Sequence, residues 1–384
     1  MNGVRDQRYQ GGLWAALFLI LVLPVLFWGS AGGSPRLSLP VIGLKTAWPR
    51  AEEVWQYFGQ AGEIPCWLGG LLTENQLIAG DTPAKIVAIG SDGSILWTEE
   101  SPVPFKAVST GDRLLLATDQ GQVSSFQADR GVVWSEATMW PIQALALDSK
   151  GQAAVAQGPM LEGQVNLLER VRLYNLAGEL QSEQLLRNSS ALNLVPDAGN
   201  WLLSIVLLSS DTPQGQILRL TPGGSEAKVL WRSPDIIQAL AVGTEGIAAG
   251  AGNRVHIMDR RDQTHDILLK NSVPDVSWVT NNMLAIVEAG DLPQAAAHIA
   301  LISTRGDKIW RRRLKGPCRS LAIRGEEILA ADPNIVYSFS LQGDINWCYE
   351  SPTLLEGIYP LAEKKEVVVT TAGNHLLLLE PPDH

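Results

Sequence analysis

Short apolar runs, separated by clusters of glycine, asparagine, aspartate or proline, recur along most of the chain. Three successive runs at 237–242, 247–250 and 254–258 show the pattern most clearly. Aliphatic and β-branched runs of this length, bounded by turn residues, predict antiparallel strands joined by tight turns. The same pattern predicts further pairs of neighbouring strands at 105–117, 142–156, 192–205, 276–287, 320–330 and 358–370.

A tryptophan follows such a set of runs about every forty residues. The six tryptophans that carry this period are Trp55, Trp97, Trp134, Trp231, Trp310 and Trp347. Four of them come three or four residues after a glycine, in the segments 93–97, 131–134, 306–310 and 343–347. An internal period of this length is typical of stacked four-stranded units, so these residues are predicted to be structural.

Two intervals between these tryptophans are long enough to hold one further repeat each. They run from Trp134 to Trp231 and from Trp231 to Trp310. We expect Leu180 in the first interval and Ile267 in the second to replace the missing ring. The sequence therefore predicts eight equivalent units.

Eight units of four antiparallel strands predict an all-β protein, an eight-bladed β-propeller. After Trp347 the sequence offers three strands, near 358–361, 366–370 and 375–380, and no fourth. The segment 54–60, one period before Trp97, supplies the strand that is missing. We expect this N-terminal strand to close the last blade, which removes two free sheet edges.

The glycine-turn-tryptophan repeat resembles that of the PQQ-like, or quinoprotein-like, propeller family over residues 54–380. The resemblance implies that each tryptophan packs between neighbouring blades and that the glycine adopts a positive φ in the turn. WD40-type propellers share the period, but the Trp-Asp pair that is usual in them does not occur in this sequence.

Features that would indicate catalysis are missing from the sequence. Quinoprotein dehydrogenases hold their cofactor beside adjacent cysteines, whereas Cys66, Cys318 and Cys348 are scattered. The five histidines show no spacing typical of zinc hydrolases, and there is no Gly-x-Ser-x-Gly motif. We therefore expect a protein that is not an enzyme and that holds no cofactor or metal, and we expect no structural disulfide.

The N-terminal region contains the other strong pattern. Residues 13–28 are uncharged and almost wholly apolar, with Trp14 and Trp28 near the two ends. This length and these interfacial aromatic residues predict a single transmembrane helix at 11–30. A cleaved signal peptide is the alternative, because small residues at 29–31 offer a processing site.

Arg5 and Arg8 precede the apolar run and outweigh Asp6, so we expect a cytoplasmic N-terminus and an extracytoplasmic propeller. The predicted divisions are a cytoplasmic segment at 1–10, the anchor at 11–30, a linker at 31–53 and the propeller at 54–384. The net charge of −10 argues against nucleic acid as a partner, which would require a basic face. The one basic run, 311–313, is interpreted as part of a solvated outer strand.

Four aspartates shortly before prolines fall between the second and third strands of their units: Asp81, Asp211, Asp291 and Asp332. Aspartate and proline in this order start turns. The alternative is an acidic ring that attracts a basic partner or a cation. The loops that carry these aspartates open on the same side as the connections between units. Three long insertions, at 157–168, 209–216 and 288–298, lie there too, which makes this side the candidate interaction face.

Two functions are compatible with these patterns. The first is a membrane-anchored interaction scaffold of the cell envelope, which binds a protein through the loops of one face of a monomeric propeller. The second is a propeller that binds or hydrolyses a small molecule or carbohydrate at its central funnel.

Overall fold

The computed structural model describes residues 48–58, 67–73, 76–81, 85–90, 92–100, 104–110, 113–118, 121–127, 131–162, 166–208, 212–292, 294–361, 365–372 and 375–382. Residues 48–384 belong to one compact unit. The predicted anchor at 11–30 lies outside the described residues. Within the described ranges, no helix has both the length and the apolar character needed to cross a membrane.

The described residues form eight four-stranded antiparallel sheets. Sheet one contains β2 (Trp67–Thr73), β3 (Gln76–Asp81), β4 (Lys85–Gly90) and β5 (Ile95–Glu100). Sheet two contains β6 (Pro104–Thr110), β7 (Arg113–Thr118), β8 (Gln122–Gln127) and β9 (Gly131–Ala137). Sheet three contains β10 (Ile142–Leu147), β11 (Ala153–Glu162), β12 (Asn166–Tyr174) and β13 (Leu180–Arg187). Sheet four contains β14 (Ser189–Asp197), β15 (Asn200–Leu207), β16 (Gln214–Leu220) and β17 (Lys228–Ser233).

Sheet five contains β18 (Ile237–Val242), β19 (Gly246–Ala251), β20 (Arg254–Asp259) and β21 (Thr264–Leu268). Sheet six contains β22 (Asp275–Thr280), β23 (Met283–Glu288), β24 (His298–Ser303) and β25 (Lys308–Arg313). Sheet seven contains β26 (Ser320–Arg324), β27 (Glu327–Ala331), β28 (Ile335–Phe339) and β29 (Ile345–Glu350). Sheet eight contains β30 (Leu355–Pro360), β31 (Val367–Thr371), β32 (His375–Glu380) and, at its outer edge, β1 (Glu52–Phe58).

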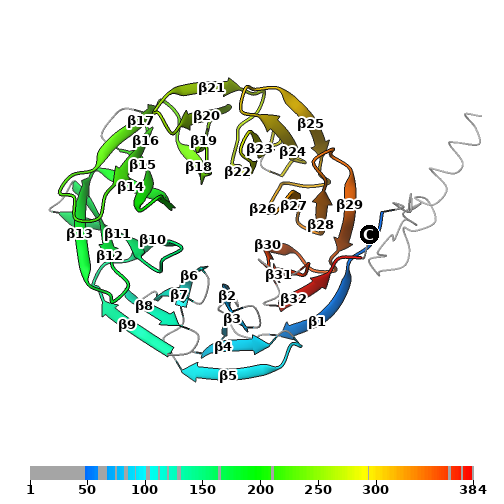
Figure 1. Cartoon of the computed structure of the whole chain (residues 1–384), viewed down its shortest axis with the longest axis horizontal. Coiled ribbons are helices and arrows are strands. Elements are labelled where there is room, and N and C mark those ends of the chain that lie inside the picture. Colours follow the sequence, from blue (N-terminus) through cyan, green and yellow to red (C-terminus); the bar gives the residue numbers. More distant parts are fainter. Residues whose placement is uncertain are drawn as a thin grey trace, which may run out of the picture. The chain divides into compact units, whose positions relative to one another are not determined.

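The eight sheets follow one another around a ring, with the first strand of each sheet innermost (Figure 1). This arrangement is a β-propeller of eight blades, as the repeat predicts. The second strands β7, β19 and β31 are buried along their whole length. Each sheet is covered on both faces by its neighbours, so its middle strands are almost continuously apolar rather than alternating.

β1 completes sheet eight by antiparallel pairing with β32, from Glu52 opposite Glu380 to Phe58 opposite His375. The two ends of the described chain are therefore joined by a strand ladder. The backbone just before β1 also reaches sheet seven. The Ala51 N–H donates to the Cys348 carbonyl at 3.1 Å, and the Cys348 N–H donates to the Pro49 carbonyl at 3.0 Å.

The repeated tryptophans of the outer strands contact the next sheet along the ring. Their partners are aromatic rings on the third strand of that sheet. Between ring centroids, Trp134 lies 5.2 Å from Tyr174, Trp231 lies 3.6 Å from His256, and Trp310 lies 5.6 Å from Phe339. The first two pairs are stacked. Trp97 lies on the outer strand β5, and Trp55 lies on β1. The forty-residue period therefore reflects contacts between sheets.

Two of the turn glycines, Gly343 and Gly178, lie against these tryptophans. Gly343 has φ = +82°, and a Cβ added to it would lie 2.6 Å from Cγ of Trp310. Gly178, also with φ = +82°, is placed in the same way against Trp134, at 2.5 Å. Glycine satisfies both requirements, since other residues disfavour this φ and no side chain fits between the turn and the ring.

The prediction for Leu180 was wrong. The outer strand has a bulge just after the turn, so Ser182 pairs with Leu173 in the register that Trp97 has with Ala88. Leu180 lies on the other side of the bulge and is exposed. Ser182 lies four residues after Gly178, the spacing that Trp97, Trp310 and Trp347 have from their own glycines, so this spacing identifies Ser182 and not Leu180 as the equivalent position.

Two residues share the role of the missing tryptophan in sheet five. Ile267 is buried and faces Gly306, the turn glycine of the next sheet. His265 Nε2 lies 2.5 Å from the Thr304 carbonyl. That contact corresponds to the bond from Trp310 Nε1 to the carbonyl of Leu341 in the following sheet, at 2.9 Å.

Candidate interaction face

The propeller has two faces that differ in the connections they carry. Because strand direction alternates within a sheet, the loops between second and third strands open on the same side as the connections between sheets. We call this side the loop face. The opposite side, which we call the turn face, carries the turns between first and second strands and between third and fourth strands.

Five exposed large hydrophobic side chains belong to connections on the loop face. They are Met139, Leu208, Ile236, Leu292 and Leu354, with exposed fractions from 40% for Ile236 to 91% for Met139. In the described turns of the turn face, Leu176 is the one side chain of this kind that is exposed. Apolar groups gathered on one face of a protein indicate a surface for interaction with another molecule.

A β-ribbon rises from this face in sheet three. β11 and β12 keep pairing beyond a bulge at residues 158–159, from Met160 opposite Leu168 to Glu162 opposite Asn166. The insertion predicted at 157–168 is therefore mostly an extension of two strands rather than a loop. Strand pairing satisfies the backbone of the ribbon and gives its side chains defined positions.

Backbone hydrogen bonds connect the ribbon to neighbouring segments on both sides. The Gly158 N–H donates to the Pro141 carbonyl at 2.7 Å, two residues from Met139. On the other side, the Asn188 N–H donates to the Leu167 carbonyl at 2.8 Å, and the Leu208 N–H donates to the Asn188 carbonyl at 2.8 Å. Met139, Met160 and Leu208 are all exposed, and they thus lie on segments that backbone hydrogen bonds join directly.

Side chains at the base of the ribbon are fixed by further contacts. The Arg170 guanidinium lies over the Trp140 ring, 4.6 Å from its centroid. Glu169 is fully buried, and its Oε2 accepts a hydrogen bond from the Ala191 N–H at 2.7 Å. Burial raises the pKa of Glu169 above its ordinary value. The ribbon therefore has a firm base, with a cationic and aromatic pair beside the apolar residues.

The structure describes the side chains of two of the four predicted aspartates, Asp291 and Asp332, and these two differ in exposure. Asp81 is the last residue of β3, and Asp211 lies outside the described residues. Asp291 is exposed, and its Oδ1 accepts a bond from Asn271 Nδ2 at 3.4 Å. Asp332 is only 2% exposed.

Asp332 organises its own loop instead of facing a partner. Its Oδ1 accepts the N–H groups of Asn334 and Ile335 at 2.9 and 2.8 Å. Its Oδ2 accepts the Tyr337 hydroxyl at 2.9 Å and the Lys315 N–H at 3.1 Å. The interpretation of Asp332 as an interaction residue was wrong, because both oxygens are occupied inside the protein.

Two acidic residues near the loop face were not predicted from the sequence. Glu288 is 1% exposed and receives two bonds from Arg311, at 3.0 and 3.1 Å. The 311–313 run is therefore not simply solvated, because Arg312 also donates to the Gly343 carbonyl at 2.8 Å. Asp275 begins the inner strand β22, and burial raises its pKa to about 6. A single sequence gives no signal for either burial.

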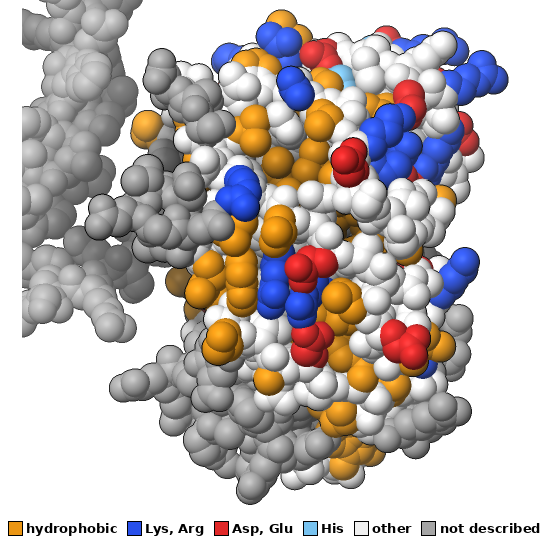
Figure 2. All heavy atoms as spheres, turned by 90° about the vertical axis from the view of Figure 1, so that its left-hand side faces the viewer, with side chains coloured by type: hydrophobic (Ala, Val, Ile, Leu, Met, Phe, Trp, Pro, Cys, Tyr) orange, Lys and Arg blue, Asp and Glu red, His pale blue; other side chains and the backbone are white. Residues whose placement is uncertain are grey.

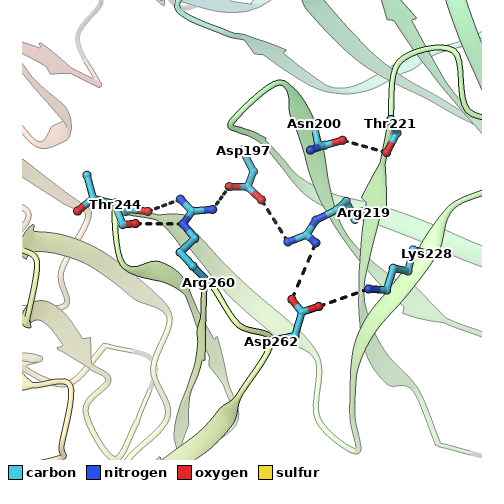
Figure 3. A network of polar contacts seen from close by, with 9 residues as sticks. Asp197, Asn200, Arg219, Thr221, Lys228, Thr244, Arg260 and Asp262 are labelled. Atoms are coloured by element: carbon cyan, nitrogen blue, oxygen red, sulfur yellow. Dashed lines mark hydrogen bonds and ion pairs between the residues drawn. The ribbon is translucent and has the colours of Figure 1, made fainter.

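The turn face is polar where sheets four and five meet (Figure 3). Asp197 is 3% exposed and is paired with Arg219 at 3.4 Å and with Arg260. Asp262 joins the network through Arg219 at 3.9 Å and Lys228 at 3.4 Å. These charges satisfy one another and connect neighbouring sheets.

The outer side of the ring has a mixed surface. Figure 2 shows hydrophobic and charged side chains interspersed there, on the side where β13 and β17 lie in Figure 1. Arg172 of β12 pairs with Glu183 at 2.6 Å and with Glu136 of the preceding sheet. Exposed apolar residues therefore occur on the outer side of the ring as well. What distinguishes the loop face is that its exposed apolar residues belong to connections between strands.

His256, a described residue of a type that can act in catalysis, is buried and paired. His256 is 4% exposed, with its Nδ1 against Asp266 and its ring stacked on Trp231. Burial lowers the pKa of His256 below its ordinary value. Cys318 and Cys348 are free, and Cys66 lies outside the described residues. Over the part of the chain that the structure describes, no three His, Cys, Asp or Glu side chains are grouped as metal ligands.

Comparison with known proteins shows the fold. No family profile matches the sequence, and no curated protein matches it. Among solved structures, BamB from Moraxella catarrhalis is similar, with a TM-score of 0.62, 12% identity, and coverage of 86% of this chain and 99% of that one.

Two other propellers are equally distant in sequence. Sqt1 from Saccharomyces cerevisiae gives a TM-score of 0.64 at 12% identity, covering 87% of this chain and 100% of that one. The C-terminal WD40 domain of Sif2 gives 0.68 at 12% identity, covering 88% and 99%. At this identity the likeness establishes the β-propeller fold and nothing about function.

Proposed function

We propose that this protein is a membrane-anchored, extracytoplasmic scaffold that binds a protein partner through the loop face of its propeller. The observation that carries the proposal is the gathering of exposed hydrophobic connections on that face. Function in repeat folds tends to be located in loops that vary on a rigid scaffold. Exposed hydrophobic side chains of this kind support binding to another protein rather than catalysis.

The connected segments around the ribbon offer the features of an interface core. Met139 and Met160 are flexible and polarisable, and such residues adapt to partner surfaces. Arg170 and Trp140 beside them belong to the residue types that dominate binding energy in protein interfaces. We propose that this part of the face forms the centre of the contact.

The membrane attachment in this proposal rests on the apolar run at 13–28 and the basic residues before it. The position of β1 is compatible with it. As the fourth strand of sheet eight, β1 begins on the turn face, so the described chain enters the propeller there. The loop face is left clear of that position.

Affinity capture from crosslinked membranes tests the proposal. A loop-face variant carries Met139→Asp, Leu208→Asp and Ile236→Asp, and a matched control carries aspartates at three exposed outer-strand positions, Ile95, Leu180 and Leu268. We expect the control to recover the same partner protein as the wild type and the loop-face variant to lose it. Equal recovery by both variants, or no reproducible partner for the wild type, would contradict the proposal.

A further inference from the structure

At most boundaries between sheets, the turn between the third and fourth strands of one sheet contacts the outer side of the sheet before it. Such contacts join Trp134 to Gly178, Gln184 to Ala227, Lys228 to Asp262, His265 to Thr304, and Trp310 to Leu341. These contacts lie at five consecutive boundaries, the first between sheets two and three and the last between sheets six and seven. The turn is therefore a regular part of how neighbouring sheets meet.

The boundary between sheets seven and eight is built differently. The fourth strand of sheet eight is β1, so no hairpin turn connects it to the third strand, β32. β32 ends at Glu380, and Pro381 and Pro382 follow. Without a turn to receive it, Trp347 Nε1 donates to Glu327 Oε1 of its own sheet at 2.8 Å.

A cleft of about 470 Å³ lies at this boundary. Its walls come from the two turns of sheet seven on the turn face, from Asn346 and Trp347 of β29, from Lys365, and from Pro381 and Pro382. Trp347 itself has no exposed surface. Anything that enters the cleft would therefore contact its rim rather than the ring.

The charged groups on the rim are of two kinds. Arg324 is paired with Glu327 at 2.8 Å, and Lys365 with Glu380 at 2.6 Å. Glu326 and Gln342 are exposed, and among the described residues their side chains make no hydrogen bond. Asn346 uses its amide nitrogen on Ser338 at 3.3 Å, which leaves its Oδ1 as an acceptor. The rim groups that remain free for hydrogen bonding are therefore the Glu326 carboxylate, the Gln342 amide and Asn346 Oδ1. They include one hydrogen-bond donor group, the Gln342 amide nitrogen, and several acceptor oxygens.

We propose that this cleft binds a glycine-containing hairpin turn of a partner protein, on the rim of the position that connected turns occupy at the other boundaries. Backbone N–H groups of such a turn would donate to Glu326 and Asn346, and a carbonyl would accept from Gln342. An apolar side chain of the turn would lie against Leu341 and Pro382. The cleft is on the turn face, so this second site does not depend on the loop face.

The test uses a peptide with the sequence of residues 338–347, the turn of sheet seven, cyclised through added terminal cysteines. Its binding to the full chain is measured by calorimetry. We expect saturable one-to-one binding that weakens about tenfold or more when Glu326→Ala and Gln342→Ala are combined, because two hydrogen bonds are lost. A peptide with valine in place of its glycine is expected to bind at least about tenfold more weakly, since the turn needs a positive φ.

Arg305→Ala provides the matched control. Arg305 has in the turn of sheet six the place that Gln342 has in sheet seven, two residues after the serine that caps the turn. We expect this variant to bind the peptide as the wild type does. Absence of saturable binding, an equal loss with Arg305→Ala, or equal binding of the valine peptide would overturn the proposal.

Discussion

Replacing Gly343 by alanine tests whether the repeated glycines serve the contacts between sheets. Two costs are expected. The first is the positive φ of +82°, which costs a non-glycine residue about 1–2 kcal/mol. The second is the collision of the new Cβ with Trp310, whose Cγ would lie 2.6 Å away.

The collision cost can be estimated from the contacts that would be disturbed. Forcing an added methyl group into a packed site typically costs about 1–3 kcal/mol. Moving the Trp310 ring would also weaken the bond from its Nε1 to the Leu341 carbonyl, which is worth about 1 kcal/mol. Together with the cost of the φ angle, Gly343→Ala should destabilise the protein by about 3–6 kcal/mol.

Gly223 provides the matched control. It has a φ of +74°, and an added Cβ would meet no atom within 4 Å. Gly223→Ala should therefore cost only about 1–2 kcal/mol. Midpoints of urea unfolding, compared at equal m-values, measure the difference.

A double-mutant cycle separates the collision from the backbone term. In a Trp310→Ala background the ring is gone, so Gly343→Ala should then cost no more than Gly223→Ala does. Equal effects of the two glycine substitutions in the wild-type background would refute the reasoning. So would an unchanged cost of Gly343→Ala once the ring has been removed.

Three further predictions concern buried ionisable groups, and unfolding in urea measures each of them. Arg311→Met should destabilise the protein by about 1.5–3 kcal/mol, because it removes two charged hydrogen bonds from buried Glu288 and leaves Lys308, 3.6 Å away, as its cationic partner. The exposed Arg313→Met should change stability by less than about 0.5 kcal/mol. Burial lowers the pKa of His256 below 6.5, so the stability present above pH 6.5 is lost as pH falls through the folded-state pKa. His256→Phe should lose less stability between pH 7 and pH 5, and an unchanged loss would contradict this. Burial raises the pKa of Asp275 from 3.8 to about 6, so the stability of the folded protein falls as pH rises through this window. The Asp275→Asn variant should therefore be more stable than the wild type at pH 7.5 by about 2–3 kcal/mol. Equal stability of the wild type at pH 4 and pH 7.5 would exclude this.

The sequence is sufficient to predict the eight sheets because the repeat records a contact made in the same way in each. Trp134, Trp231 and Trp310 all face a ring of the next sheet, and the strand count at the two ends indicates that β1 belongs to the last sheet. The choice of Leu180 was wrong because it lies two residues after Gly178, whereas the four-residue spacing of the other repeats identifies Ser182.

The candidate site was only partly predictable. Strand alternation identifies the loop face, but which side chains are exposed on it depends on neighbours that are distant in the sequence. Met139 is an unremarkable residue in the sequence and is 91% exposed, whereas Asp332 has a polar side chain and is buried. Pairing of Glu288 with Arg311 joins two strands across 23 residues and leaves no local pattern.

Site-specific photocrosslinking of the full chain in its native membranes tests the loop-face proposal most directly. A photoreactive amino acid is placed in turn at Met139, Leu208 and Ile236 on the loop face, and at Leu176 on the turn face as the control. We predict that the three loop-face positions crosslink to the same protein and that Leu176 does not. Crosslinking to that protein from Leu176 but from none of the loop-face positions would contradict the proposal.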